Sequence, residues 1–155
     1  ISLALIDLDH FKHVNDRYGH ATGDMALRIF GREVRSGLRG GDLLVRWGGE
    51  EFLLFASGTS AANAQLMLER MRVRLAETSV WADCPQAQVR FSAGLTMLKT
   101  DESLEDALQR ADDALYEAKR LGRDRTVYAD AELIREVDGP SIAQTALTPT
   151  APTRE

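Results

Sequence analysis

The sequence has few of the features that mark the less common classes of protein. Its single cysteine, Cys84, excludes an intramolecular disulfide framework and suits a reducing compartment, which favours the cytoplasm. No apolar run reaches the roughly 18 to 20 residues that a membrane-spanning helix needs, so we expect no direct membrane contact from this stretch. Basic residues are not in excess either, because 24 acidic and 19 basic residues give a net charge of −5. This balance argues against broad binding to nucleic acid.

Proline is also scarce, and its distribution divides the chain. Three of the four prolines stand after residue 139, among threonines and few large apolar residues. Such a composition does not offset the entropy of ordering the chain, so residues 130–155 are predicted to be a flexible tail or linker. Residues 1–129 are long enough for one domain with a buried core. Because the chain begins with isoleucine inside an apolar run, we expect this domain to be N-terminally incomplete and part of a larger protein.

Hydrophobic periodicity predicts the order of the elements. The predicted strands are residues 1–8, 43–45, 52–55, 88–98 and 125–128, and the predicted amphipathic helices are residues 25–38, 60–78 and 103–122. The last helix has the clearest ends, because Ser103 with Asp106 resembles a capping box and Gly122 suits a C-cap. The order predicts an α+β fold in which helices cover a central, mostly antiparallel sheet.

The most distinctive stretch is residues 46–52, Arg-Trp-Gly-Gly-Glu-Glu-Phe, which lies between two apolar runs. Glycine enters positive-φ turn conformations at no steric cost, so the Gly-Gly pair predicts a β-hairpin with Glu50 and Glu51 at its tip. Two adjacent carboxylates repel each other, which favours a bound divalent metal or a basic partner. A solvated turn that is merely acidic accounts for the same residues.

Polar residues also gather at the end of the first strand and after it. The two-residue period of a strand puts Asp7 and Asp9 on one side, where they suit a metal clamp or a strand end that turns to solvent. If the hairpin neighbours this strand, Asp7 and Glu50 could meet around a metal. Residues 11–24 are dense in hydrogen-bonding side chains around two glycines. This density predicts either a loop that wraps a ligand or a set of caps for helices and turns.

Two cations stand near the end of the last predicted helix. Lys119 and Arg123 are four residues apart, so they are expected to project from one face of that helix. Together they could hold a phosphate chain. Alternatively, they complement the helix dipole and solvate the helix end.

Taken together, these motifs are similar to those of the GGDEF domains, the diguanylate cyclase family. The resemblance covers residues 1 to about 129, and the motifs agree in order and spacing. They are Asp7-Leu8-Asp9-His10-Phe11-Lys12 with Asn15-Asp16, Gly19-His20, Gly23-Asp24, Gly48-Gly49-Glu50-Glu51-Phe52, Phe91-Ser92-Ala93-Gly94, and Ala111-Asp112-Asp113-Ala114-Leu115-Tyr116 leading to Ala118-Lys119-Arg120-Leu121-Gly122-Arg123. One departure is that family members carry an Asp-x-Leu-Thr-Gly-Leu-x-Asn-Arg stretch before the first strand, and this sequence has none of it.

The resemblance implies a palm-like fold with a ferredoxin-like core, as in nucleotidyl cyclases and polymerases. It implies that a homodimer condenses two GTP into cyclic di-GMP with release of two pyrophosphate, using two Mg²⁺ ions per site, for which Mn²⁺ can substitute. The alternative is a catalytically silent domain that binds GTP or cyclic di-GMP. By the family's pattern, the metal ligands are Asp7, the Leu8 carbonyl and Glu50; the catalytic residues are Glu50, Glu51 and Lys12; and the substrate-binding residues are Phe11, Lys12, Asn15, His20, Asp24, Lys119 and Arg123.

The resemblance also implies an inhibitory product site. Family members carry Arg-x-x-Asp five residues before the signature, and Arg39-Gly40-Gly41-Asp42 falls at that spacing. Arg70 stands where the family often supplies a second arginine. Arginine pairs bidentately with phosphate or with a guanine edge, so Arg39, Asp42 and Arg70 are expected to bind cyclic di-GMP and to cause feedback inhibition.

Overall fold

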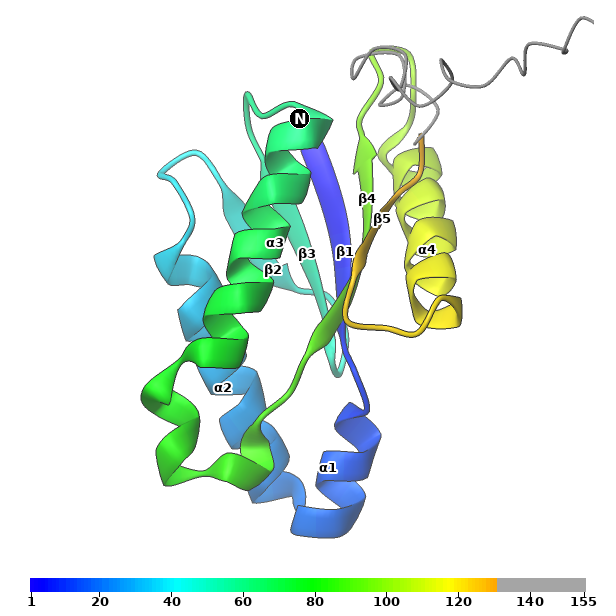
Figure 1. Cartoon of the computed structure of the whole chain (residues 1–155). Helices are drawn as coiled ribbons and strands as arrows, with labels where there is room; N and C mark the ends of the chain where they lie inside the picture. The colour runs from blue at the N-terminus through cyan, green and yellow to red at the C-terminus, as the bar shows by residue number, and fades with distance from the viewer. Residues whose placement is uncertain (131–155) are drawn as a thin grey trace, which may run out of the picture.

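The computed structural model describes residues 1–130, and residues 131–155, all but the first residue of the predicted tail, lie outside the described residues. In chain order the elements are β1 (Ser2–Leu8), α1 (Phe11–Tyr18), α2 (His20–Ser36), β2 (Leu43–Arg46), β3 (Glu51–Ala56), α3 (Ala61–Glu77), the 3₁₀ helices η1 (Ser79–Asp83) and η2 (Pro85–Ala87), β4 (Phe91–Met97), α4 (Leu104–Arg120) and β5 (Thr126–Tyr128). Helices cover both faces of one sheet, which confirms the predicted α+β fold (Figure 1). Within residues 1–130, no helix is both long enough and apolar enough to cross a membrane.

The sheet has five strands in the order β2-β3-β1-β4-β5. Neighbouring strands are antiparallel except for β4 and β5, so the prediction of a mostly antiparallel sheet is confirmed. β1 lies at the centre, where every one of its residues is buried. α2 and α3 lie on one side of this sheet, α4 lies on the other, and α1 lies beyond the end of β1 (Figure 1).

The side chains of β1 alternate between two cores, because successive residues of a strand point to opposite faces. Ile6 and Leu8 pack in the larger core, which includes residues of α2 and α3. Leu3 and Leu5 pack in the smaller core with residues of α4. Asp7 follows Leu3 and Leu5 in the same alternation, so its carboxylate is directed to the α4 side of the sheet. The hydrophobic pattern of one strand therefore sets the direction of a charged side chain.

α4 packs closely on β4 because one residue of that strand has no side chain. A Cβ at Gly94 would overlap the carbonyl oxygen of Ala111 and the amide nitrogen of Leu115, so a glycine is required at this contact. The helix begins as the sequence predicts: the Ser103 hydroxyl accepts a hydrogen bond from the Asp106 amide at 3.1 Å and donates one to the Asp106 carboxylate at 2.7 Å. Both features place α4 firmly on the sheet.

The polar stretch of residues 11–24 is not a loop, and that prediction is wrong. It forms α1 and the start of α2, which begins at His20 rather than near residue 25. α1 becomes a helix because Phe11 and Val14, three residues apart, are buried together. Gly19 separates the helices with φ of 88°, which favours glycine. Neither helix start has a side-chain cap, so the alternative interpretation as caps does not hold either.

The strand predicted over residues 88–98 is shorter, since β4 spans Phe91–Met97. The residues before it follow the two 3₁₀ helices, which the sequence pattern did not predict. Val89 and Ala87 are nevertheless buried in the larger core. An alternating apolar pattern thus continues beyond the strand, because burial does not require sheet pairing.

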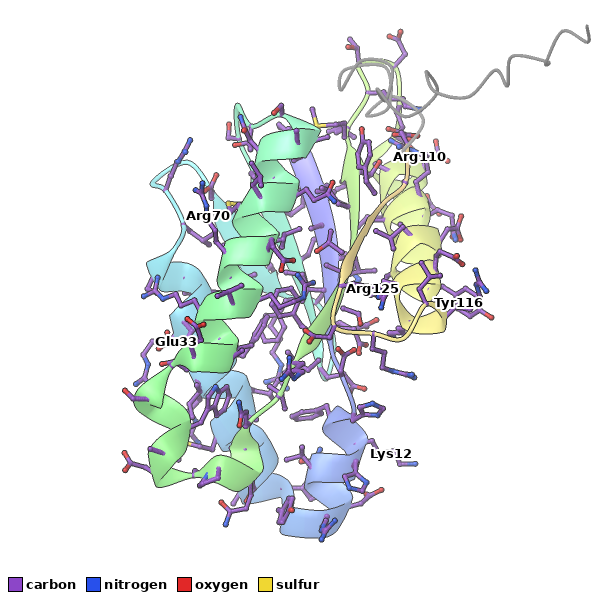
Figure 2. The ribbon with its side chains drawn as sticks, viewed as in Figure 1. Lys12, Glu33, Arg70, Arg110, Tyr116 and Arg125 are labelled. Atoms are coloured by element: carbon purple, nitrogen blue, oxygen red, sulfur yellow. The ribbon has the colours of Figure 1, made fainter. Side chains whose placement is uncertain are left out.

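Arg110 of α4 forms a clamp at the end of the domain where β5 ends (Figure 2). Its guanidinium donates to the Glu102 carboxylate at 2.6 Å, to the Met97 carbonyl at 2.7 Å and to the Thr96 hydroxyl. It also forms an ion pair with Asp130 at 2.7 Å. One side chain therefore holds together the end of β4, the following loop, α4 and the chain that leaves β5.

This clamp predicts a loss of stability in acid. The hydrogen bond from Arg110 lowers the pKa of Glu102 from 4.5 to about 2. Because the folded protein holds this carboxylate in its charged form better than the unfolded chain does, the pair contributes stability above pH 4.5 and loses it as the pH falls toward about 2. Urea unfolding measured across this range should show a smaller loss of unfolding free energy for Glu102→Gln than for the wild type. Asp101→Asn, which removes the exposed neighbouring carboxylate, should behave as the wild type. If the unfolding free energy depends on pH equally in all three proteins, the lowered pKa of Glu102 is contradicted.

Candidate active site

The end of β1 and the acidic hairpin lie side by side. β1 and β3 are antiparallel neighbours in a register that pairs Asp7 with Glu51. The Leu8 amide donates to the Glu50 carbonyl at 3.1 Å, which extends the pairing to the tip of the hairpin. The expectation that Asp7 and Glu50 come from neighbouring strands is therefore confirmed.

The hairpin turn is held by backbone contacts and by one arginine. The amides of Trp47 and Gly48 both donate to the Glu51 carbonyl, at 2.8 and 3.2 Å. The Arg46 guanidinium donates to the Gly48 carbonyl at 3.2 Å and to the Gly49 carbonyl at 2.7 Å. Neither glycine has a positive φ, so the predicted reason for the pair is wrong. Gly48 instead provides space, because a Cβ there would lie 2.7 Å from a carboxylate oxygen of Glu51.

Negative charge converges on Asp7, and a single lysine faces it. Asp7 is only 9% exposed, and its Oδ2 lies 3.2 Å from Nζ of Lys119 in the last turn of α4. Burial raises the pKa of Asp7, Lys119 partly opposes this, and the nearby Glu50 and Glu51 raise the pKa further. The charged form of Asp7 therefore remains costly even with Lys119 beside it, and a further cation would stabilise it.

The donor set fits a hard metal ion that also binds a ligand. Asp7 and Glu50 offer carboxylate oxygens, and the peptide of Leu8 lies between them, which are the ligand types that Mg²⁺ takes. Within residues 1–130, no group of three or more His, Cys, Asp or Glu side chains is arranged to enclose a metal. Mg²⁺ commonly keeps water and substrate phosphates as its other ligands, so an incomplete protein shell is compatible with it.

Asp9 plays a different part from Asp7. Its Oδ1 accepts a hydrogen bond from the Ser92 hydroxyl at 2.7 Å, and its Oδ2 accepts one from the Asp124 amide at 3.0 Å. Asp9 is only 7% exposed. It is neither half of a metal clamp with Asp7 nor a strand end that turns to solvent, because both of its oxygens are bound within the fold.

A glycine lets Asn15 of α1 pack against the start of α2. The Asn15 side chain lies against Gly23, where a Cβ would overlap its Oδ1. Asp24 is the next residue and is exposed at a groove that also includes Leu27. His20 is exposed at the first position of the same helix. An amide and a carboxylate are groups that can bind the donor and acceptor edge of a base, and Asn15 contacts the residue directly before Asp24.

The predicted phosphate-binding residues surround the start of α1. Lys12 lies in the first turn of α1 and points outward from the domain (Figure 2). Arg123 does not project from the same helix face as Lys119, which corrects the prediction, because α4 ends at Arg120. It belongs to the turn that follows and lines a cavity of about 510 Å³ together with His10. The three cations therefore come from three places, with Lys12 on α1, Lys119 on α4 and Arg123 on the turn after α4.

The Arg-x-x-Asp motif forms a turn on a separate groove. The Asp42 carboxylate accepts from the Arg39 amide at 2.9 Å and from the Ser57 amide at 3.3 Å. Arg70 of α3 lines the same groove, whose volume is about 460 Å³, and Glu33 of α2 lies at its other wall. Figure 2 shows Arg70 on the side of α3 that faces α2 and the following segment. The three residues predicted to form one site therefore lie around one groove.

Sequence reasoning missed supporting residues. Arg46 holds the hairpin turn, Gly23 makes room for Asn15, and Arg72 is buried under the turn after α4 although the pattern of α3 places it among polar residues. The position of Arg46 two residues before the Gly48-Gly49 pair is the only one of these signals that the sequence shows. The contacts of Gly23 and Arg72 depend on tertiary packing.

Known proteins match most of the chain. Residues 1–125 match the family described as diguanylate cyclase, GGDEF domain. The chain is 44% identical over 128 residues to diguanylate cyclase DgcM of Escherichia coli K12, covering 83% of this chain and 30% of that protein. It is 42% identical over 127 residues to diguanylate cyclase DgcP of Pseudomonas aeruginosa, covering 82% of this chain and 19% of that protein. The chain thus spans about a fifth to a third of the length of these curated relatives.

Solved structures share the fold. The GGDEF domain of DgcB from Caulobacter crescentus, in complex with c-di-GMP, has a TM-score of 0.77 and 32% identity, covering 83% of this chain and 77% of that one. The active GGEEF domain of a diguanylate cyclase from Vibrio cholerae has a TM-score of 0.74 and 32% identity, covering 83% and 81%. Fold and site together define a palm-like α+β domain with an acidic hairpin beside its central strand. The chain belongs to the GGDEF family of diguanylate cyclase domains.

The contact between Asn15 and Gly23 can be tested directly. Gly23→Ala should displace the Asn15 side chain and lower stability by about 1–3 kcal/mol, because the new methyl group overlaps the amide. Gly31→Ala is the matched control on α2, since a Cβ there meets no atom within 4 Å. NMR should show a shift of the Asn15 side-chain amide for Gly23→Ala and none for Gly31→Ala. The melting temperature should fall in Gly23→Ala and should not fall in Gly31→Ala, because alanine favours the helix interior more than glycine does. An unmoved Asn15 resonance in Gly23→Ala would contradict the contact.

Proposed function

We propose that this domain is a diguanylate cyclase that joins two GTP into cyclic di-GMP and releases two pyrophosphate. The observation that carries the proposal is the pairing of Asp7 with the acidic hairpin, opposite Lys119. Membership of the GGDEF family and the likeness to proteins named diguanylate cyclases support it. Because each domain has one such site, two domains must face each other for the two GTP molecules to react. We therefore propose a homodimer as the active form, acting in the cytoplasm, where GTP is available.

Two Mg²⁺ ions per site, or Mn²⁺ in their place, would be held by Asp7, the Leu8 carbonyl and Glu50. When bound, such ions offset the charge that develops on the phosphates during transfer. Glu50 also accepts the proton of the attacking 3′-hydroxyl in this proposal, and Glu51 assists beside it. The raised pKa of Asp7 supports the assignment, because a buried carboxyl among acidic neighbours gains most from an added cation.

The remaining residues hold the nucleotide. Lys119, Arg123 and Lys12 would bind the triphosphate with the backbone after Phe11, since cations and amides at a helix start attract phosphate. Asn15 and Asp24 would bind the guanine edge, with His20 beside them. Phosphoryl transfer depends mainly on positioning and charge neutralisation, and this set supplies both.

A catalytically silent domain that binds GTP or cyclic di-GMP is the second candidate. Its binding function would use the groove around Arg39, Asp42 and Arg70, whose arginines suit a phosphate-bearing dinucleotide. The Caulobacter domain was solved with c-di-GMP. In an active cyclase the same groove would serve feedback inhibition, so the two candidates differ in turnover and not in product binding.

Glu50→Gln tests turnover. Protein freed of bound nucleotide is incubated with GTP and Mg²⁺, and cyclic di-GMP is measured by chromatography. Because the change removes both a metal ligand and the proton acceptor, we expect a loss of about 100- to 10,000-fold with an unchanged melting temperature. Glu77→Gln, at the end of α3, is the matched control and should keep full activity. Retained activity in Glu50→Gln would refute the roles given to this residue, and a wild type that binds cyclic di-GMP without making it would favour the silent domain.

Arg39→Ala tests the product site. Loss of a charged hydrogen bond to phosphate should weaken cyclic di-GMP binding by about tenfold or more, as measured by calorimetry, and relieve inhibition without lowering the initial rate. Lys99→Ala removes a cation from the loop after β4 and serves as the control. Unchanged affinity and unchanged inhibition in Arg39→Ala would show that the product binds elsewhere.

A further inference from the structure

The chain after α4 turns back through a backbone conformation that is costly for most residues. Gly122, Arg123 and Asp124 have φ of 115°, 64° and 47°, so three consecutive residues lie in the left-handed region. Glycine adopts this conformation freely, whereas an arginine and an aspartate with Cβ atoms do so at a cost in free energy. Such residues persist only where the surroundings hold them. Two sets of contacts hold the turn that carries Arg123.

The buried carboxylate of Asp9 is the first restraint. Its Oδ2 accepts from the backbone amide of Asp124 at 3.0 Å, directly after Arg123. Its Oδ1 accepts from the Ser92 hydroxyl of β4 at 2.7 Å, which fixes the carboxylate between two strands and the turn. The Arg123 amide itself donates to the Ala118 carbonyl of α4 at 3.0 Å. Both peptides that flank Arg123 are therefore bound.

The side chain of Asp124 is the second restraint. Its Oδ2 accepts from Arg90 at 2.6 Å, and its Oδ1 lies 3.2 Å from Nε of Arg72 as an ion pair. Arg72 is only 7% exposed, lies 4.6 Å from the centre of the Phe91 ring and donates to the Thr126 hydroxyl at 3.2 Å. The turn is thus joined to α3, β4 and β5 as well as to the end of β1.

We propose that Asp9 is a positioning residue that places Arg123 for the phosphates of the nucleotide. The inference rests on the proposed function, in which Arg123 binds the triphosphate. Asp9 follows the strand that carries Asp7, and its contact with the turn fixes Arg123 relative to that strand. In this proposal the end of β1 fixes the position of the Asp7 carboxylate directly, and it fixes the position of Arg123 through the bond from Asp9 to the Asp124 amide. A preorganised arginine loses less freedom on binding than a mobile one.

A double-mutant cycle separates this role from a purely structural one. Affinity for a non-hydrolysable GTP analogue with Mg²⁺ is measured by calorimetry in the wild type, Asp9→Asn, Arg123→Ala and the double variant, with the melting temperature of each. Asn is close in shape to Asp but uncharged, so a bond from the Asp124 amide to its side-chain oxygen is weaker than the charged bond to the carboxylate. We expect each single variant to bind about tenfold more weakly, and the double variant to bind no more weakly than Arg123→Ala alone.

A globally destabilised variant is the control. Arg110→Gln loosens the clamp at the opposite end of α4 and should lower the melting temperature without changing affinity. If Asp9→Asn does not fold, Ser92→Ala replaces it, because this change removes the hydroxyl that fixes the Asp9 carboxylate and should weaken affinity in the same direction. If Asp9→Asn binds the GTP analogue with wild-type affinity, or if the double variant loses affinity by the product of the two single losses, the role given to Asp9 is overturned and the proposed function still stands. Unchanged affinity in Arg123→Ala would overturn both the inference and the phosphate-binding role of Arg123.

Discussion

The antiparallel pairing of β1 with β3 is the constraint on which the rest of the site depends. The two faces of β1 pack in different cores, and a slip of one residue would turn Asp7 into the larger apolar core, so burial fixes the register. That register sets Asp7 opposite Glu51 and bonds the Leu8 amide to the Glu50 carbonyl. Hydrophobic burial therefore brings together carboxylates that repel each other. The cost is visible in the raised pKa of Asp7, and it is compensated only in part by Lys119.

α4 supplies that compensation because its position is restrained along its whole length. Arg110 holds its first turns to the β4 end, Gly94 lets its backbone approach the sheet, and the contact of Asp9 with Asp124 holds the turn that follows it. A helix fixed in this way keeps the ammonium group of Lys119 beside Asp7 without a reorganisation step. Catalysis by electrostatic stabilisation depends on such preorganised charge.

Hydrophobic periodicity and capping predicted what local pattern determines: the fold class, the two strands of the hairpin, the start of α4 and the edge strand β5. They failed where tertiary packing overrides local composition. Residues 11–24 carry so many polar side chains that two buried residues, Phe11 and Val14, were too weak a signal for α1. Arg123 lies beyond its helix because Gly122 lets the chain turn back. The contacts of Asp9 with Ser92 and Asp124 join distant parts of the chain, and no spacing rule reveals such pairs. The site residues themselves came from the family's motifs, while the structure shows which of them lie together.

The hairpin also connects the two proposed ligand sites, and its rigidity limits how they can influence each other. Asp42, before β2, accepts from the Ser57 amide after β3, which closes the base of the hairpin beside the groove of Arg70. Arg46 closes the tip beside Glu50 by binding two glycine carbonyls. Because the hairpin is held at both ends, we expect binding at its base to change the backbone of its tip very little. Under the proposed feedback inhibition, a product bound at the base is therefore expected to act on the orientation of whole domains rather than by deforming the acidic tip, since the proposed reaction needs two domains to face each other.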